Sequence, residues 1–321
     1  MTPDSAAILA LLLLPGIGPA AVHRAIAASS ALHMPLPDML NTDPRDLTHR
    51  LPPGLHDVAS LVARCSTTDR AQARDLLDKL AACGADAITA TDPDWPSTLA
   101  RLGTAMPPII FFKGRRDLLA KPAAAVVGAR DPSNAGARLA SNCAAFFAAE
   151  HIAIVSGGAR GVDTRAHLAA IHAGGKTLVV LPQGLLTYDA PAAISRAVDA
   201  GRALILSQFQ PDSPWETHAA VTRNATIGAL ARLVCVVEPR KTGGSIRAAR
   251  IAIGLGKPVA AWCSTPATRR LLETAGAAEL ADQAGRLRRE YLRELWRQNV
   301  RTAPVQPDLL QDMPLGPNGR T

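Results

Sequence analysis

The sequence is poor in aromatic side chains, which make up 3% of its 321 residues. Nucleic-acid-binding proteins that rely on stacking need rings along a whole groove, so this composition favours contacts to phosphate groups instead. The five cysteines are odd in number and include no Cys-x-x-Cys pair. No zinc ligand set or disulfide framework is therefore readable, which suits a reducing cytoplasm. The sequence predicts a cytoplasmic protein without a metal or another cofactor.

Long apolar runs are also missing, so no membrane partner is expected. The N-terminal run AAILALLLL is broken by Pro15 and Gly16 well short of the roughly 20 residues of a membrane span, and no Lys or Arg precedes it. It is predicted to be a buried helix. Charged residues make up only 19%, yet 35 Lys and Arg against 27 Asp and Glu give a net charge of +8. This balance favours nucleic acids or nucleotides as partners.

Two short helices around a glycine turn are predicted at the N-terminus. Apolar spacing indicates helices over residues 6–14 and 19–28, and the PGIG segment between them has two glycines that allow a sharp turn. The pattern is similar to a helix-hairpin-helix, whose turn offers backbone N–H groups to a phosphate; a purely structural helical pair is the alternative. Residues 29–58, rich in Pro, Asp and His, are predicted to be loop, and helical spacing returns over residues 58–80.

Apolar runs of strand length alternate with helix-length segments between residues 123 and 263. The runs are AAAVVGA, IAIVSG, TLVVLP, ALILSQ, LVCVVEP and PVAAWC, and a further strand is predicted at PPIIFF. Continuous apolar strands separated by helices indicate a parallel sheet with both faces covered. The predicted fold class is therefore α/β: an extended Rossmann-like, doubly wound parallel sheet with a small N-terminal helical domain (helix-hairpin-helix or SAM-like) and a C-terminal helical segment.

The predicted domain boundaries follow these changes of pattern. Residues 1–85 are the N-terminal helical domain, 86–265 the Rossmann-like core, 266–303 a basic helical segment and 304–321 a disordered tail. In the basic segment, arginines accompany an apolar stripe that includes Leu287, Tyr291 and Leu295. We expect an amphipathic helix docked on the core with a solvated cationic face; an extra nucleic-acid contact is the alternative.

The candidate binding residues follow the apolar runs, because ligands of open parallel sheets bind beyond the carboxyl ends of the strands. The second run ends in SGGARGVD, where glycines free the backbone, an arginine supplies charge and a helix begins. The first run ends in VVGAR, the fifth in EPRKTGGS, and an Arg-Asn pair precedes ATIGALA. The predicted phosphate-binding residues are Gly128, Arg130, Ser156, Gly157, Gly158, Arg160, Gly161, Arg223, Asn224, Lys241, Thr242, Gly243, Gly244 and Ser245.

No pattern in the sequence predicts catalysis, so we expect a binding protein without catalytic residues. Ser156 lacks the Gly-x-Ser-x-Gly elbow of serine hydrolases, and there is no Gly-x-x-x-x-Gly-Lys-Ser/Thr loop for triphosphates. Asp163 and His167 are four residues apart on one helix face and are expected to be a structural polar pair.

These motifs, in this order, resemble those of the DprA/Smf family of DNA-processing proteins. The resemblance runs over roughly residues 6–263, through LLLLPGIGPAAV, DPDWPSTLARL, PPIIFFKGRRDLL, VVGARDPSNAG, VSGGARGVDTRAH, AGGKTLVVLPQGL, TRNATIGALA and KTGGSIRAA. It implies binding of single-stranded DNA without sequence preference, a homodimer, and delivery of a RecA-type recombinase onto incoming strands during DNA uptake and natural transformation. The pocket residues that it implies are Arg130, Gly157, Gly158, Arg160, Gly161, Arg223, Asn224 and Lys241.

Several positions depart from that family's pattern. Ala225 replaces the second arginine of an Arg-Asn-Arg motif, and Ser207, Gln208 and Phe209 stand where Ser-Glu-Tyr is common. A C-terminal winged helix is not recognisable. Two alternatives stay open: a nucleotide-sensing protein of a defence or mobile-element system, and a nucleotide phosphoribohydrolase, whose motif needs a glutamate that is missing here.

Overall fold

The structure is a computed structural model and describes residues 1–240 and 243–298. Two residues of the predicted site, Lys241 and Thr242, lie outside the described residues, as does the predicted disordered tail at 304–321. In the described part of the chain, no helix is both long and apolar enough to cross a membrane.

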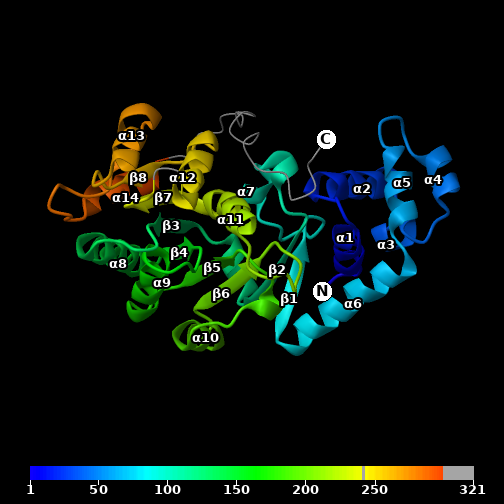
Figure 1. Ribbon diagram of the computed structural model, residues 1–321, viewed down its shortest axis with the longest axis horizontal. Helices are drawn as coiled ribbons and strands as arrows, with labels where there is room; N and C mark the ends of the chain where they lie inside the picture. Colours follow the sequence, from blue (N-terminus) through cyan, green and yellow to red (C-terminus); the bar gives the residue numbers. More distant parts are fainter. Residues whose placement is uncertain (241–242, 299–321) are drawn as a thin grey trace.

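A nine-stranded sheet runs through the described part of the chain, in the order β1-β2-β6-β5-β4-β3-β7-β8-β9 (Figure 1). The predicted runs are confirmed as parallel strands β3 (Ala123–Gly128), β4 (Ala153–Ser156), β5 (Thr177–Leu181), β6 (Ala203–Ser207), β7 (Ala231–Val237) and β8 (Val259–Ala261). Strand order reverses at β3, with β4 on one side and β7 on the other. The doubly wound Rossmann-like fold is thus confirmed, and its ligand crevice is expected beyond the end of β3.

Three strands extend this parallel core. β2 (Ile109–Gly114), predicted at PPIIFF, pairs antiparallel with β6, and β1 (Ala85–Thr89) pairs antiparallel with β2. At the other edge, β9 (Ala278–Glu279) adds a short parallel strand next to β8. The sequence did not predict β1 or β9, because neither is a continuous apolar run of strand length.

Helices cover both faces of the parallel sheet, as Figure 1 shows. One face packs against α11 (Thr217–Leu230), α12 (Gly244–Gly254) and α13 (Pro266–Ala275). The other packs against α8 (Asn134–Ala149), α9 (Val162–His172), α10 (Ala192–Asp199) and α14 (Arg289–Arg297). Short helical turns lie between these elements: α7 (Ser97–Ala100), η1 (Gly103–Ala105), η2 (Arg116–Ala120) and η3 (Leu185–Thr187). Burial on both faces explains the continuous apolar runs.

Helices also precede the sheet and form an apolar core with its antiparallel edge. They are α1 (Pro3–Leu13), α2 (Pro19–Ala31), α3 (Leu36–Met39), α4 (Pro44–Arg50), α5 (Asp57–Arg64) and α6 (Thr67–Ala82). The predicted turn between α1 and α2 is present, with Gly16 at φ +78°. Because Ala87 and Phe111 of the sheet belong to this helical core, the two parts share apolar contacts, and the domain boundary at residue 85 stays a prediction.

The loop predicted over residues 29–58 was wrong, because this stretch holds α3, α4 and the end of α2. Pro44 begins α4, and the Asp43 carboxylate accepts a hydrogen bond of 2.8 Å from the backbone N–H of Arg45. Proline and aspartate suit the first turn of a helix, so the residues that suggested loop mark helix starts instead. In the same way, Ser66 caps α6 and divides the helical spacing of residues 58–80 into two helices.

The described part of the basic segment packs on the layer that holds α8. Leu292 and Leu295 of α14 are buried in one core with Phe147 of α8. Arg293 forms ion pairs with Glu150, at 2.7 Å, and with Glu290. This is the arrangement expected of a docked amphipathic helix.

Candidate anion-binding site

The structure brings the predicted glycine turns together at the carboxyl ends of β3, β4 and β7. β3 lies between the other two strands and pairs with both. A Cβ on Gly128 would lie 2.0 Å from the carbonyl oxygen of Val237, so glycine is needed where β3 and β7 end. The Ser245 hydroxyl donates to the Gly128 carbonyl oxygen at 2.8 Å. The start of α12 is therefore fixed against the end of β3.

The turn between β4 and α9, residues 157–161, depends on its glycines. Gly158 and Gly161 have φ angles of +67° and +90°, which side chains rarely adopt. A Cβ on Gly161 would lie 2.4 Å from the carbonyl oxygens of Ala129 and Arg130. In residues 1–240 and 243–298, the N–H groups of Gly158, Arg160 and Gly161 have no acceptor. Unpaired N–H groups at the start of a helix provide a site for an anionic oxygen.

Arg223 lies beneath this turn, which corrects the predicted direct contact with phosphate. The residue is only 4% exposed, and its Nη1 donates to the carbonyl oxygen of Val180 at 2.6 Å. A Cβ on Gly157 would fall 1.7 Å from that Nη1, so the guanidinium packs directly against the glycine. Burial lowers the pKa of Arg223 to about 10, which still leaves it charged at neutral pH. Arg223 therefore supports the turn from inside.

Asp163 and His167 are buried below the same turn. The Asp163 carboxylate accepts a hydrogen bond of 3.2 Å from the Gly157 N–H. Burial raises the pKa of Asp163, and the charge of Arg223 acts against that rise. His167 Nδ1 lies 2.6 Å from the Thr177 hydroxyl, and burial, followed by the Arg223 charge, lowers its pKa to about 3. Their burial fits the structural role expected for this pair.

Ser156 and Asn224 are also internal, so the structure corrects their predicted ligand contacts. The Ser156 hydroxyl donates to the Val126 carbonyl oxygen at 2.7 Å and has no exposed surface. Asn224 Nδ2 donates to the Ala220 carbonyl oxygen at 2.6 Å. A Cβ on Gly244 would lie 2.4 Å from that Nδ2. Asn224 thus packs against the start of α12, and its neighbour Arg223 packs against the turn at residues 157–161.

The exposed cations Arg130 and Arg160 differ in their partners. Arg160 Nη2 lies 2.8 Å from Asp131 Oδ1, so a phosphate would have to displace this carboxylate. Arg130 pairs with no carboxylate of the described residues; its guanidinium carbon lies 5.6 Å from the centroid of the Trp215 ring. The sequence patterns did not predict Asp131 or Trp215 as neighbours of these cations. The signals were the adjacency of Arg130 and Asp131, and a tryptophan standing alone in a polar loop.

Glu238 occupies the start of α8. It adopts φ +46°, and its carboxylate accepts hydrogen bonds of 2.7 and 2.6 Å from the N–H and hydroxyl of Ser133, the N-cap of α8. A carboxylate is favoured at this end of a helix. A carboxylate of the protein therefore occupies the start of α8. The start of α12 differs, because its N-cap, Gly243, has no side chain to cap it.

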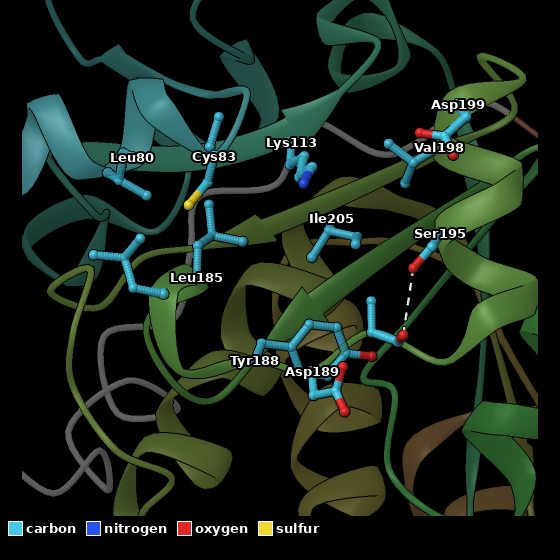
Figure 2. Close-up of a pocket in the computed structure, with 13 residues that line it drawn as sticks. Leu80, Cys83, Lys113, Leu185, Tyr188, Asp189, Ser195, Val198, Asp199 and Ile205 are labelled. Atoms are coloured by element: carbon cyan, nitrogen blue, oxygen red, sulfur yellow. Dashed lines mark hydrogen bonds between the residues drawn. The ribbon is translucent and has the colours of Figure 1, made fainter.

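A cavity of about 330 Å³ lies beside α10, over β1, β2 and β6 (Figure 2). Lys113 and Asp199 line it among apolar side chains such as Ile205, and Tyr188 lies on the side opposite Lys113. The Tyr188 hydroxyl is 3.9 Å from the place of a Cβ on Gly158, so this side chain stands between the cavity and the turn. Groups of both charges face the same space, which defines no single ligand chemistry. No cluster of His, Cys, Asp and Glu suited to a metal occurs within residues 1–240 and 243–298.

A doubly wound sheet with glycine turns and unpaired N–H groups at its strand ends is typical of α/β proteins that bind anions at the carboxyl ends of parallel strands. Within that class, the chain belongs to the DNA recombination-mediator protein A family, whose model matches residues 86–291. The resemblance to DprA/Smf DNA-processing proteins is thus confirmed.

Curated relatives agree with this membership. The chain is 34% identical to the putative DNA processing protein DprA of Mycobacterium tuberculosis (strain ATCC 25618 / H37Rv) over 205 residues, which cover 59% of this chain and 52% of the relative. It is 37% identical to DNA processing protein DprA of Streptococcus pneumoniae (strain ATCC BAA-255 / R6) over 171 residues, 52% of this chain and 59% of the relative. The chain spans about half the length of the curated relatives it matches.

Solved structures show the same fold. The X-ray structure of DNA processing protein A from Streptococcus pneumoniae superposes with a TM-score of 0.56 at 25% identity and covers 82% of this chain and 94% of its own. A second structure, of DNA processing protein A from Helicobacter pylori, was reported for its single-stranded DNA binding mode. It superposes with a TM-score of 0.54 at 25% identity and covers 62% of this chain and 91% of its own.

Proposed function

We propose that this protein binds single-stranded DNA, without sequence preference, along the carboxyl ends of β3, β4 and β7. The observation that carries the proposal is the turn at residues 157–161, where the N–H groups of Gly158, Arg160 and Gly161 have no acceptor in the described part of the chain. Exposed Arg130 lies beside this turn. Hydrogen bonds from such groups to phosphate oxygens hold the backbone of a nucleic acid and do not read its bases. The Helicobacter pylori relative, described by its single-stranded DNA binding mode, supports the same ligand.

The spread of these groups favours a polymer over a free nucleotide. Beyond β8, at the start of α13, an open hollow of about 570 Å³ is lined by two arginines, Arg269 and Arg270, and by one carboxylate, that of Glu273, among others. It continues the row of strand ends that begins at Arg130. A chain with many phosphates contacts several of these places at once, whereas one nucleotide reaches only one of them.

Family membership supports the finer parts of the proposal. We propose that the protein acts in the cytoplasm as a homodimer and delivers the bound strand to a RecA-type recombinase during DNA uptake and recombination. It has a binding role and no catalytic one. We also propose residues 243–245, at the start of α12, as contacts, together with Lys241 and Thr242, which lie outside the described residues.

The test is an anisotropy titration of labelled single-stranded and double-stranded oligonucleotides of equal length at several salt concentrations. We expect tighter binding of the single strand and a steep linear fall of log affinity with log salt, because each phosphate contact releases counterions. Free mononucleotides, added at the same phosphate concentration, are expected to compete poorly. The proposal is wrong if the single strand fails to bind at low salt, or if mononucleotides displace it equally well.

A further inference from the structure

Trp215 differs from the other tryptophans of this aromatic-poor chain. Trp95, Trp262 and Trp296 pack within or against the apolar cores, whereas Trp215 is 46% exposed. Large aromatic side chains contribute most when buried. Trp215 therefore keeps an exposed aromatic face that a ligand or partner can contact.

The loop that carries Trp215 is held in place by the fold. It connects β6 to α11, and its carbonyl oxygens at Pro211 and Ser213 accept hydrogen bonds of 2.9 Å from the N–H groups of Leu186 and Gly184. The Thr187 hydroxyl also donates to the Ser213 carbonyl oxygen at 2.9 Å. Since these anchors end two residues before Trp215, the ring is presented by a fixed support.

Arg130 connects this ring to the anion site. Its guanidinium carbon lies 5.6 Å from the ring centroid, while its own carbonyl oxygen touches the turn at Gly161. The ring, the cation and the unpaired N–H groups are therefore neighbours. A nucleotide offers the matching pair of groups, an anionic phosphate and a flat base, and a base stacks on an aromatic ring whatever its identity.

We propose that Trp215 stacks on a nucleobase of the bound strand while Arg130 binds an adjacent phosphate. This rests on the proposed function and adds to it the residue that recognises a base. It also supplies a physical reason for preferring single strands, because the bases of a duplex are already stacked on one another and their faces are closed to the ring. Phosphate contacts alone provide no such selection.

The test compares Trp215→Ala and Trp215→Phe with the wild type in anisotropy titrations. One probe is a labelled oligothymidylate; the other is an abasic oligonucleotide of the same length, which keeps the phosphates and lacks the bases. Trp215→Ala is expected to weaken oligothymidylate binding about ten-fold and to leave abasic binding and the salt slope unchanged, because the ring carries no charge. Trp215→Phe is expected to recover most of the loss. Tyr291→Ala, which removes a 39% exposed aromatic from α14, is the matched control and is expected to bind as the wild type does.

Each of the other outcomes overturns a defined part of the proposal. Unchanged oligothymidylate binding by a folded Trp215→Ala variant, with its melting temperature preserved, overturns base stacking and leaves phosphate binding intact. Equal weakening of both probes means that Trp215 only positions Arg130, which also overturns stacking. A change of oligomeric state in sedimentation, with DNA affinity unchanged, would assign the ring to a contact between protein chains. Failure of the wild type to bind either probe overturns the proposed function itself.

Discussion

Arginine is abundant in two regions of this protein, and the two regions use it in different ways. On α14, Arg293 pairs with Glu150 and Glu290, and just before this helix Arg286 pairs with Asp282 and Arg288 with Glu279. At the carboxyl ends of the strands, Arg130 has no carboxylate partner in the described residues, and the neighbouring turn has N–H groups without acceptors. The number of cations therefore does not identify an anion site. What identifies it is an arginine without a carboxylate partner beside backbone N–H groups that have no acceptor in the described residues.

Packing explains the difference. The Arg293 guanidinium carbon lies 5.2 Å from the centroid of the Phe146 ring, and that of Arg232 lies 5.4 Å from Trp296. Arginine stems of this kind cover apolar surface while their heads stay near water. Arg293 of α14 and Arg232 of β7 thus help to dock this helix on the sheet layer. The arginines beyond β3 and β4 border a backbone turn that an acceptor from outside the protein can complete.

The largest effect on DNA affinity is expected from adding a side chain to the glycine turn at residues 157–161. In Gly161→Ala, the new Cβ would meet the carbonyl oxygens of Ala129 and Arg130 at 2.4 Å and sit at φ +90°. The turn must shift and misdirect its N–H groups. Loss of two charge-assisted hydrogen bonds corresponds to a fall in single-strand affinity of roughly 100-fold or more, measured by anisotropy.

Gly174→Ala is the matched control for that variant. Gly174 also has a positive φ, +74°, at the other end of α9, but a Cβ there meets no atom within 4 Å. It is expected to cost about 1 kcal/mol of stability and to leave DNA affinity unchanged. If both variants bind DNA like the wild type, the turn is not the phosphate site.

A smaller effect is expected from single arginines, and it tests the comparison directly. Arg130→Ala removes a cation without a carboxylate partner and is expected to lower affinity about ten-fold at low salt. The slope of log affinity against log salt should then correspond to about one fewer ion released on binding. Arg293→Ala removes a paired cation from α14. It is expected to leave the slope unchanged and to lower the free energy of unfolding slightly, as urea titration would measure. Equal changes of slope in the two variants would contradict the division between the regions.

The smallest effect is an increase in affinity. Asp131→Asn frees Arg160 from its 2.8 Å ion pair and removes a negative charge beside the proposed phosphate path. Exposed pairs of this kind are worth about 0.2–1 kcal/mol, so the affinity should rise about two-fold to five-fold at low salt and less at high salt. A decrease would mean that Asp131 orients Arg160 for binding.

The sheet could be predicted from the sequence because each parallel strand is buried on both faces and is therefore a short, continuous apolar run. The two-residue β9 and the mixed pattern of β1 have no such signal. The proline and aspartate residues before Asp57 were misread as loop, because they punctuate short helices there. Local patterns thus gave the fold, and failed where an element is too short to show its period.

The site was predicted only in part. The glycines of residues 157–161 are visible in the sequence because a turn between a strand and a helix needs them. The burial of Arg223 is not visible, since an arginine in a motif has the same letter whether it binds a ligand or supports a turn. The guanidinium of Arg223, on α11, fits only because Gly157, in the turn after β4, has no side chain. Such complementarity between distant residues appears only in three dimensions.

Arg223 has one more consequence. Its guanidinium joins the end of β5 at Val180 to the turn after β4, and the next residue, Asn224, packs against the start of α12. Residues that are already held rigidly lose little conformational entropy when a ligand arrives. This ordering therefore takes place while the chain folds, and a passing strand meets a surface that is preorganised for it.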